Sequence, residues 1–303
     1  MRFSLLQLWS MLAPTATYLL LTGFQSGEFY MDLYCEADGV FIRVQKIVYH
    51  SVILHSDAAA RCFIASLEHR PQFAASAVRT LHMGVAVRNN NAAKILNLCK
   101  GITDLTLRVV CHHILTKNPV IEPLEALPLT SLSVDLSVIF HDQRSYLPNL
   151  QIVHHITHLH LTNAWACWEG IPIGLPRLTQ LTHLSVPWNT SRSDINLLHE
   201  IMKSTNLKVV VLWRSEYEKH DALVECLQRG GLKDHRIVCF CSAQYLYYYS
   251  IHGGFWGYAE NLVKWREEVE GMSVGSPLQC STLLNKTYQP IHLRVPSTWG
   301  CLL

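Results

Sequence analysis

A short alternation of apolar and polar residues recurs along the chain at nearly constant intervals. Each occurrence has two apolar residues separated by one other residue, a period-two pattern that predicts a β-strand with one buried face. The apolar pairs are Leu81/Met83, Leu105/Leu107, Leu132/Val134, Leu159/Leu161, Leu184/Val186, Val210/Leu212 and Val238/Phe240. Successive pairs are separated by 24, 27, 27, 25, 26 and 28 residues. We therefore expect seven strands, at residues 78–84, 102–108, 130–136, 156–162, 181–187, 207–213 and 235–241.

Between several of these strands the hydrophobic period changes to that of an α-helix. Apolar residues share one helical face at residues 92–99, 195–202 and 222–227. Gly101 and the pair Gly230-Gly231 follow helical stretches, where a left-handed residue commonly closes the helix. The chain is thus expected to alternate strands with helices.

The repeat length falls within the range of leucine-rich repeats. One strand–helix unit cannot bury both of its apolar faces alone, but stacked units share a continuous core, which explains the regular spacing. The expected fold class is α/β, a leucine-rich-repeat-like solenoid with a parallel sheet of about seven strands and helices on the convex side. The alternative is a doubly wound α/β domain, which would normally show longer helices and a glycine-rich phosphate turn.

The pattern divides the chain into three regions. Residues 1–45 form an apolar segment, which we interpret as a cap, a signal-like sequence after Arg2 or a mis-annotated start. Residues 46–270 form the repeat domain. Trp256, Tyr258, Leu262 and Trp265 predict a final helix that closes the end of the array. Residues 271–303 lack periodicity and contain three prolines, so we expect a loosely ordered tail.

Composition narrows the classes of function. The 25 Lys and Arg residues nearly balance the 23 Asp and Glu residues, so a basic surface for nucleic acid is not expected. The ten cysteines contain no CxxC pair and are interpreted as reduced thiols. The N-terminal apolar run is shorter than the roughly 20 residues of a membrane span. We expect a cytoplasmic or nuclear protein, with secretion as the alternative.

The sequence contains none of the common local signatures of catalysis. GxSxG, GxxxxGK[ST], GxGxxG and HExxH are all absent, so we expect a non-enzymatic protein without a cofactor. An enzyme with a dispersed active site is the remaining alternative. His158, His160 and His183 would project from neighbouring strands about 4.8 Å apart. Because Asp135 is the only obvious carboxylate near them, we interpret them as polar surface residues rather than metal ligands.

The surface that such an array offers to a partner is its concave sheet, formed by the residues that alternate with the apolar pairs. These residues become more apolar toward the C-terminal strands. We expect a protein partner to bind His82, Asp104, Arg108, Asp135, His158, His160, His183, Ser185 and Trp213.

The order of several runs carries a family resemblance. AASAVRTLHMG, AAKILNLCKGITDLTL, ITHLHLTNAWACWEG and FWGYAENLVKWREE resemble segments of leucine-rich-repeat proteins of mushroom-forming fungi, and the similarity covers about residues 45–270. Many proteins of that group carry an amino-terminal F-box, which joins a ubiquitin ligase through a Skp-type adaptor. The resemblance implies substrate recognition by the repeats. Residues 1–45 show no recognisable F-box, and a secreted leucine-rich-repeat binding protein is the alternative.

Overall fold

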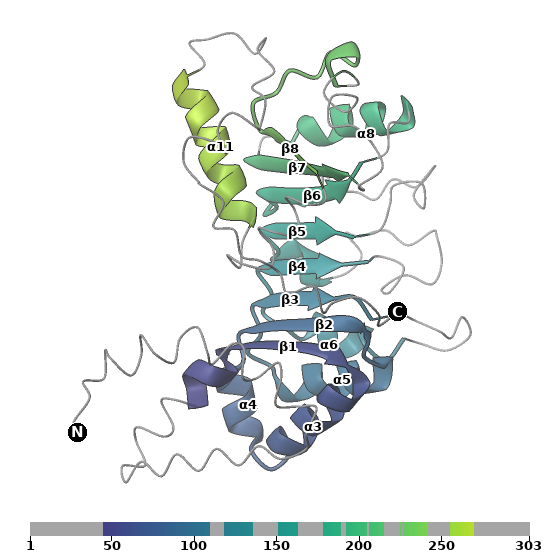
Figure 1. The fold of residues 1–303 in the computed structure, drawn as a ribbon, viewed down its shortest axis with the longest axis vertical. Helices are drawn as coiled ribbons and strands as arrows, with labels where there is room; N and C mark the ends of the chain where they lie inside the picture. The colour runs from purple at the N-terminus through teal and green to yellow at the C-terminus, as the bar shows by residue number, and fades with distance from the viewer. Residues whose placement is uncertain are drawn as a thin grey trace, which may run out of the picture.

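A single all-parallel sheet of eight strands organises the described part of the protein. The computed structural model describes residues 45–109, 118–135, 151–162, 178–188, 192–204, 206–214, 225, 227–241 and 255–269. The strands follow one another across the sheet in sequence order (Figure 1). They are β1 (Ser51–Ser56), β2 (Thr80–Ala86), β3 (Asp104–Leu107), β4 (Ser131–Val134), β5 (His158–Leu161), β6 (His183–Pro187), β7 (Val209–Arg214) and β8 (Ile237–Cys241).

Helical segments lie between the strands and after the last one. They are α3 (Asp57–Leu67), α4 (Pro71–Ala77), α5 (Asn89–Leu98), α6 (Ile121–Glu125), the 3₁₀ turn η3 (Gln151–His154), α8 (Arg192–Met202) and α11 (Phe255–Val269). The expected helices at 92–99 and 195–202 are confirmed as α5 and α8. In a doubly wound sheet the strand order reverses at one point. Here it runs from β1 to β8 without a reversal, so the doubly wound alternative is excluded.

All seven expected strands are present, and β1 is an additional strand before them. Val52 pairs with Leu81, and Val52 and Leu54 extend the same apolar row by one strand. The expected strand count of seven was therefore too low. Ile53 lies between these two residues and is also apolar, so the run shows no alternation by which a half-buried strand is recognised.

The main core lies on one face of the sheet, which we call the core face. Leu81, Leu105, Leu132, Leu159 and Leu184 stand side by side along it and are almost completely buried. Apolar side chains of α3, α5 and α8 pack against this row in the same cluster. The constant spacing of the apolar pairs is thus explained by in-register stacking of successive strands.

The last strand has a different register from the one expected. Val210 pairs with Ile237 and Leu212 pairs with Cys239, so Ile237 and Cys239 belong to the core face. The expected inward pair, Val238 and Phe240, faces the other side. Because the side-chain period of a strand is two, a shift of one residue reverses every side chain.

The final helix exists as expected, but its position differs from the predicted end cap. α11 packs on the second face of the sheet, the face opposite the core, against β7 and β8 (Figure 1). Apolar side chains on that face explain this position, because Val209, Val211, Val238 and Phe240 replace the polar residues of earlier strands. Burial of this apolar strip favours a helix across the sheet.

The two expected helix-closing glycines have different roles. Gly231 has φ +72° and is the left-handed residue predicted there. Gly101 does not have a positive φ; instead, a Cβ at this position would lie 2.0 Å from the carbonyl oxygen of Ala75. Gly101 is therefore required by close backbone packing.

Among the described residues, the helices are too short or too polar to cross a lipid bilayer. The expectations for the N-terminal segment up to residue 44 and for the tail at 271–303 lie outside the described residues.

Candidate functional site

The nine residues expected to form a binding surface all project from the second face or lie at its edge, but α11 divides them. His158, His160, His183, Ser185 and Trp213 come from β5, β6 and β7, where α11 packs. The other four residues, His82, Asp104, Arg108 and Asp135, are half-buried and lie on or directly after β2, β3 and β4. The expected continuous surface is thus divided into two groups of residues, one beneath α11 and one on the earlier strands.

An apolar contact holds α11 against β7 and β8. Phe255, Ala259 and Val263 are buried on one side of the helix, at the i, i+4 and i+8 positions of a single stripe. Phe255 meets Phe240 at a ring-centroid distance of 6.4 Å in an edge-on arrangement. Trp213 packs at the border of this cluster, so it is not a freely exposed anchor for a partner.

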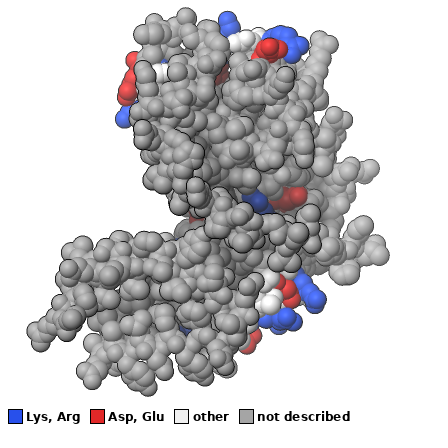
Figure 2. All heavy atoms as spheres, in the orientation of Figure 1, with Lys and Arg blue, Asp and Glu red and all other residues white. Residues whose placement is uncertain are grey.

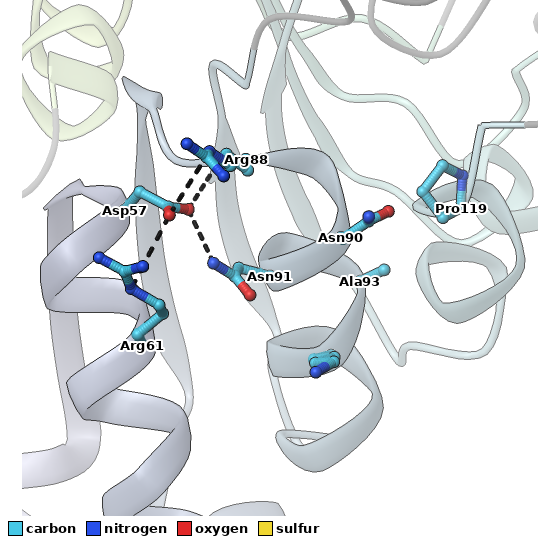
Figure 3. Close-up of a pocket in the computed structure, with 8 residues that line it drawn as sticks. Asp57, Arg61, Arg88, Asn90, Asn91, Ala93 and Pro119 are labelled. Carbon is cyan, nitrogen blue, oxygen red and sulfur yellow. Dashed lines mark hydrogen bonds and ion pairs between the residues drawn. The ribbon is translucent and has the colours of Figure 1, made fainter.

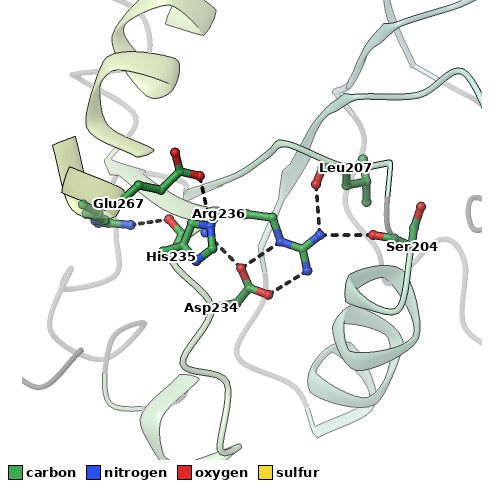
Figure 4. Close-up of polar contacts among 7 residues, drawn as sticks. Ser204, Leu207, Asp234, His235, Arg236 and Glu267 are labelled. Atoms are coloured by element: carbon green, nitrogen blue, oxygen red, sulfur yellow. Dashed lines mark hydrogen bonds and ion pairs between the residues drawn. The ribbon is translucent and has the colours of Figure 1, made fainter. Parts of the chain in front are cut away.

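Polar contacts fasten the C-terminal part of α11 to the beginning of β8 (Figure 4). Arg266 donates hydrogen bonds to the carbonyl oxygens of His235 and Ile237, at 3.2 and 2.6 Å. Glu267 Oε1 lies 3.3 Å from His235 Nε2. These contacts place the preceding turns of the helix over β5 and β6.

Arg236 connects the end of α8 to β8 in the same region. Its guanidinium donates to the carbonyl oxygens of Ser204 and Leu207, and it forms an ion pair with Asp234 at 2.7 Å (Figure 4). Hydrogen bonds and the charge of Arg236 lower the pKa of Asp234, although burial acts in the opposite direction. Every acceptor of Arg236 is either a backbone carbonyl or Asp234. We therefore assign Arg236 a structural role, which is to hold α8 against β8.

A row of threonines runs across the sheet immediately before the strands. We call Thr103, Thr130, Thr157 and Thr182 the threonine ladder. Each hydroxyl donates to the carbonyl oxygen of the corresponding residue on the preceding strand, with distances of 3.1 to 3.4 Å. The same carbonyls accept backbone N–H groups from the strand that follows. The ladder therefore repeats one local geometry at four successive strands.

Histidines follow the last two threonines of the ladder and form a stacked pair. His158 and His183 are partners in the β5–β6 register, and their rings are parallel within 9° at a centroid distance of 4.0 Å. His158 Nδ1 lies 2.8 Å from the Thr157 hydroxyl, and His183 Nδ1 lies 2.8 Å from the Thr182 hydroxyl. Both rings thus have the same orientation, with their Nε2 atoms on the side away from the ladder.

Residues of α11 cover this histidine pair. The Trp256 ring meets both imidazoles edge-on at 5.4 Å. Glu260, one helical turn later, places Oε1 2.9 Å from His183 Nε2. Ligand atoms from His158, His183 and Glu260 all lie within 4.8 Å of one another. The sequence gives no sign that Glu260 lies beside these histidines, because the helix that carries it is distant in sequence from β5 and β6.

The histidines of this region are neutral at pH 7. Burial and the neighbouring His183 together lower the pKa of His158 to about 4, against the opposing effect of the Glu260 charge. Burial and the charge of Lys208 lower the pKa of His183 to about 4. His160 is fully enclosed beside Phe255, and burial together with Arg108 lowers its pKa to about 3. A neutral His183 cannot form a true salt bridge with Glu260.

The second group of predicted site residues is half-buried. His82 pairs with Thr106 across β2 and β3, and Asp104 pairs with Ser131 across β3 and β4. Burial raises the pKa of Asp104, and a hydrogen bond with Ser131 opposes this change. Ile53, next to His82 on the edge strand β1, is 43% exposed. This group offers both charges and an apolar contact.

A separate hollow of about 500 Å³ lies on the helical side, between the beginnings of α3 and α5 (Figure 3). Asp57 lines this hollow and accepts hydrogen bonds from the Asn91 side chain and the Arg88 backbone, at 2.7 and 3.1 Å. Burial opposes ionisation of Asp57, but these bonds and the charges of Arg88 and Arg61 lower its pKa. Because the Asp57 carboxylate already has partners within the chain, its charge stabilises the fold and does not indicate a ligand site.

Charged side chains of the described residues form small groups of mixed sign on the face shown in Figure 2. Comparison of the chain with models of protein families, with curated proteins and with solved structures finds no match. The site therefore has to be interpreted from its own geometry.

Proposed function

We propose that this chain is a non-enzymatic protein-binding scaffold, built as a leucine-rich-repeat-like solenoid that presents the second face of its sheet to a partner. The observation that carries this proposal is the half-buried group of His82, Asp104, Arg108 and Asp135, on or directly after consecutive strands. In-register strands hold these side chains at fixed spacing on a rigid surface, which suits recognition of an extended protein segment.

The proposed surface is limited to the N-terminal half of the face. Over β5 to β8, α11 already occupies the position that a partner would take. The N-terminal half combines carboxylates, a guanidinium and an imidazole with the exposed side chain of Ile53. Mixed charge around an apolar contact is typical of a non-obligate protein interface.

The biological context we propose is substrate recognition in a ubiquitin ligase, as the resemblance to fungal F-box proteins implies. In that context the partner on the N-terminal half would be a protein destined for degradation. A Skp-type adaptor would have to be contacted by another part of the chain. Secretion as a repeat-type binding protein is the competing context.

Affinity purification of the full chain followed by mass spectrometry tests the proposal. We expect partners that are retained by wild type and lost when Asp104 and Arg108 are both replaced by Ala. The matched control replaces Lys94 and Glu125, two exposed residues of opposite charge on α5 and α6, by Ala and should retain the same partners. Equal capture by both double variants would reject the surface. Co-purification of a Skp-type adaptor and a cullin would support the ligase context, whereas glycosylated protein in the medium would reject it.

A further inference from the structure

The stacked histidines and Glu260 contain two imidazoles and one carboxylate, a ligand set that zinc uses in proteins. We propose that Nε2 of His158, Nε2 of His183 and a carboxylate oxygen of Glu260 bind one zinc ion that joins α11 to β5 and β6. The ligand atoms come from three elements, and they already lie within 4.8 Å of one another. This site goes beyond the proposed scaffold function and does not depend on it.

The threonine ladder determines which nitrogen of each imidazole is available. At Thr130 the next residue is Ser131, yet the hydroxyl still donates to the Thr103 carbonyl at 3.2 Å. The same donation at Thr157 and Thr182 uses the single hydroxyl proton, so each of these oxygens accepts from the neighbouring imidazole Nδ1–H. We therefore assign both histidines to the Nδ1–H tautomer, with a lone pair on Nε2.

This tautomer is the one found in many metal sites. A histidine that binds a metal through one nitrogen commonly donates its other N–H to a fixed acceptor, which orients the ring and keeps it neutral. The Thr157 and Thr182 hydroxyls supply such acceptors at 2.8 Å. They are in turn held by the backbone of the preceding strand. The sheet thus provides the supporting contacts that a metal site needs.

In the Nδ1–H tautomer, a cation between His183 Nε2 and the Glu260 carboxylate would satisfy both atoms. His183 Nε2 is buried and makes no hydrogen bond of acceptable geometry among the described residues, although Glu260 Oε1 is only 2.9 Å away. A lone pair and a carboxylate at this distance repel each other unless a positive charge lies between them. A zinc ion accepts electron density from both atoms and removes the repulsion.

Small movements convert the arrangement into a tetrahedral site. With zinc–ligand bonds of about 2.0–2.2 Å, ligand atoms are roughly 3.3 Å apart. The Glu260 side chain is half-exposed, so its carboxylate has room to move slightly away from His183, now 2.9 Å from Oε1, and toward His158. The parallel rings direct their lone pairs the same way, so they must tilt toward each other when the ion binds. Trp256 limits the access of water from one side.

Metal titration of the full chain after treatment with a chelator tests this proposal. We expect one equivalent of zinc, and cobalt(II) in its place should give the visible absorption of a tetrahedral site. E260Q and H183Q should weaken binding more than about 100-fold, since each removes a ligand. E267Q is the matched control, because Glu267 lies on the same helix beside a single histidine, His235. Absence of zinc binding, or equal affinity of E260Q and E267Q, would overturn the site.

A second pair of variants tests the role of the ladder. T182V removes the acceptor of His183 Nδ1–H and should weaken zinc binding about 10–100-fold. T130V makes the same change at a ladder position without a histidine and should bind zinc like wild type. Circular dichroism should show that both variants are folded. If T182V and T130V bind zinc equally well, or if ¹⁵N shifts place the His183 proton on Nε2 in the presence of zinc, the assignment is wrong.

Discussion

Arg266 in α11 donates a hydrogen bond of 2.6 Å to the backbone carbonyl of Ile237, the first residue of β8. The same guanidinium reaches the carbonyl of His235 at 3.2 Å. This contact joins the last described helix to the last strand and orients the helix across the second face. The position of Glu260 above the stacked histidines depends on it.

Replacement of Arg266 by Ala should loosen α11 without unfolding the sheet. The change removes two hydrogen bonds from a charged donor, and we expect a loss of about 2 kcal/mol in the free energy that holds the helix in place. Hydrogen–deuterium exchange should become faster in α11 but remain slow in β2 to β4. Lys264→Ala, at an exposed position of the same helix, should leave exchange unchanged. Equal exchange in both variants would contradict the anchoring role.

Replacement of Phe255 by Ala should have a larger effect on the same helix. Phe255 is 2% exposed and packs against His160 and Phe240. Loss of a buried aromatic side chain costs about 3–5 kcal/mol, more than the loss expected from removing the Arg266 hydrogen bonds. We expect a lower urea midpoint and stronger binding of a hydrophobic dye to the exposed face. An unchanged midpoint would show that α11 does not stabilise the fold.

Substitution by Ala should destabilise the protein at Gly101 and stabilise it at Gly257. At Gly101 the new Cβ would lie 2.0 Å from the Ala75 carbonyl oxygen, and we expect a destabilisation of about 1–3 kcal/mol. At Gly257, within α11, nothing lies within 4 Å of the new Cβ, so the higher helix propensity of Ala should stabilise the protein by about 0.5–1 kcal/mol. Thermal unfolding of the two variants measures the difference. A stable G101A would show that the helix-to-strand turn relaxes easily.

His82 should make stability dependent on pH in the acidic range. Burial, followed by the charges of Arg108, directly after β3, and His55 on β1, lowers the pKa of His82 to about 4. The unfolded chain binds a proton at its ordinary pKa of about 6.5, before the folded protein does, so the free energy of unfolding falls as pH decreases between about 6.5 and 4. Above about pH 6.5 this contribution is constant.

Urea denaturation at pH 7.5 and pH 5 measures this effect. In H82Q the loss of stability between the two pH values should be smaller than in wild type, because the titrating group is gone. His155→Gln is a suitable control, since that histidine is exposed. Identical pH dependence in wild type and H82Q would show that His82 is protonated equally easily in both states.

The central strands could be predicted from the sequence because only one of their two faces is apolar, so only one orientation buries it. In the strand at residues 104–107, apolar and polar side chains alternate, and the partners of Leu105 on both sides have the same pattern. Burial of one face then determines the register. Among the site residues, the proximity of His158 and His183 was predicted for the same reason, and the structure confirms it.

The last strand and the final helix could not be placed in this way. Val238, Cys239 and Phe240 are all apolar, so either set of alternate side chains could face the main core. Which set does so depends on α11, which buries Val238 and Phe240 from the other side. A helical pattern also shows that α11 has an apolar stripe, but it does not show which surface that stripe covers.

The sequence by itself determined the repeated strands, their spacing and the parallel stacking of the core, because these depend on local periodicity and on contacts between adjacent units. Only the tertiary structure decided the register of β8, the position of α11 and the contact of Glu260 with His183. These features arise from packing between segments far apart in the chain. The free energy of such packing depends on the shape of both surfaces, and a local pattern describes one surface at a time.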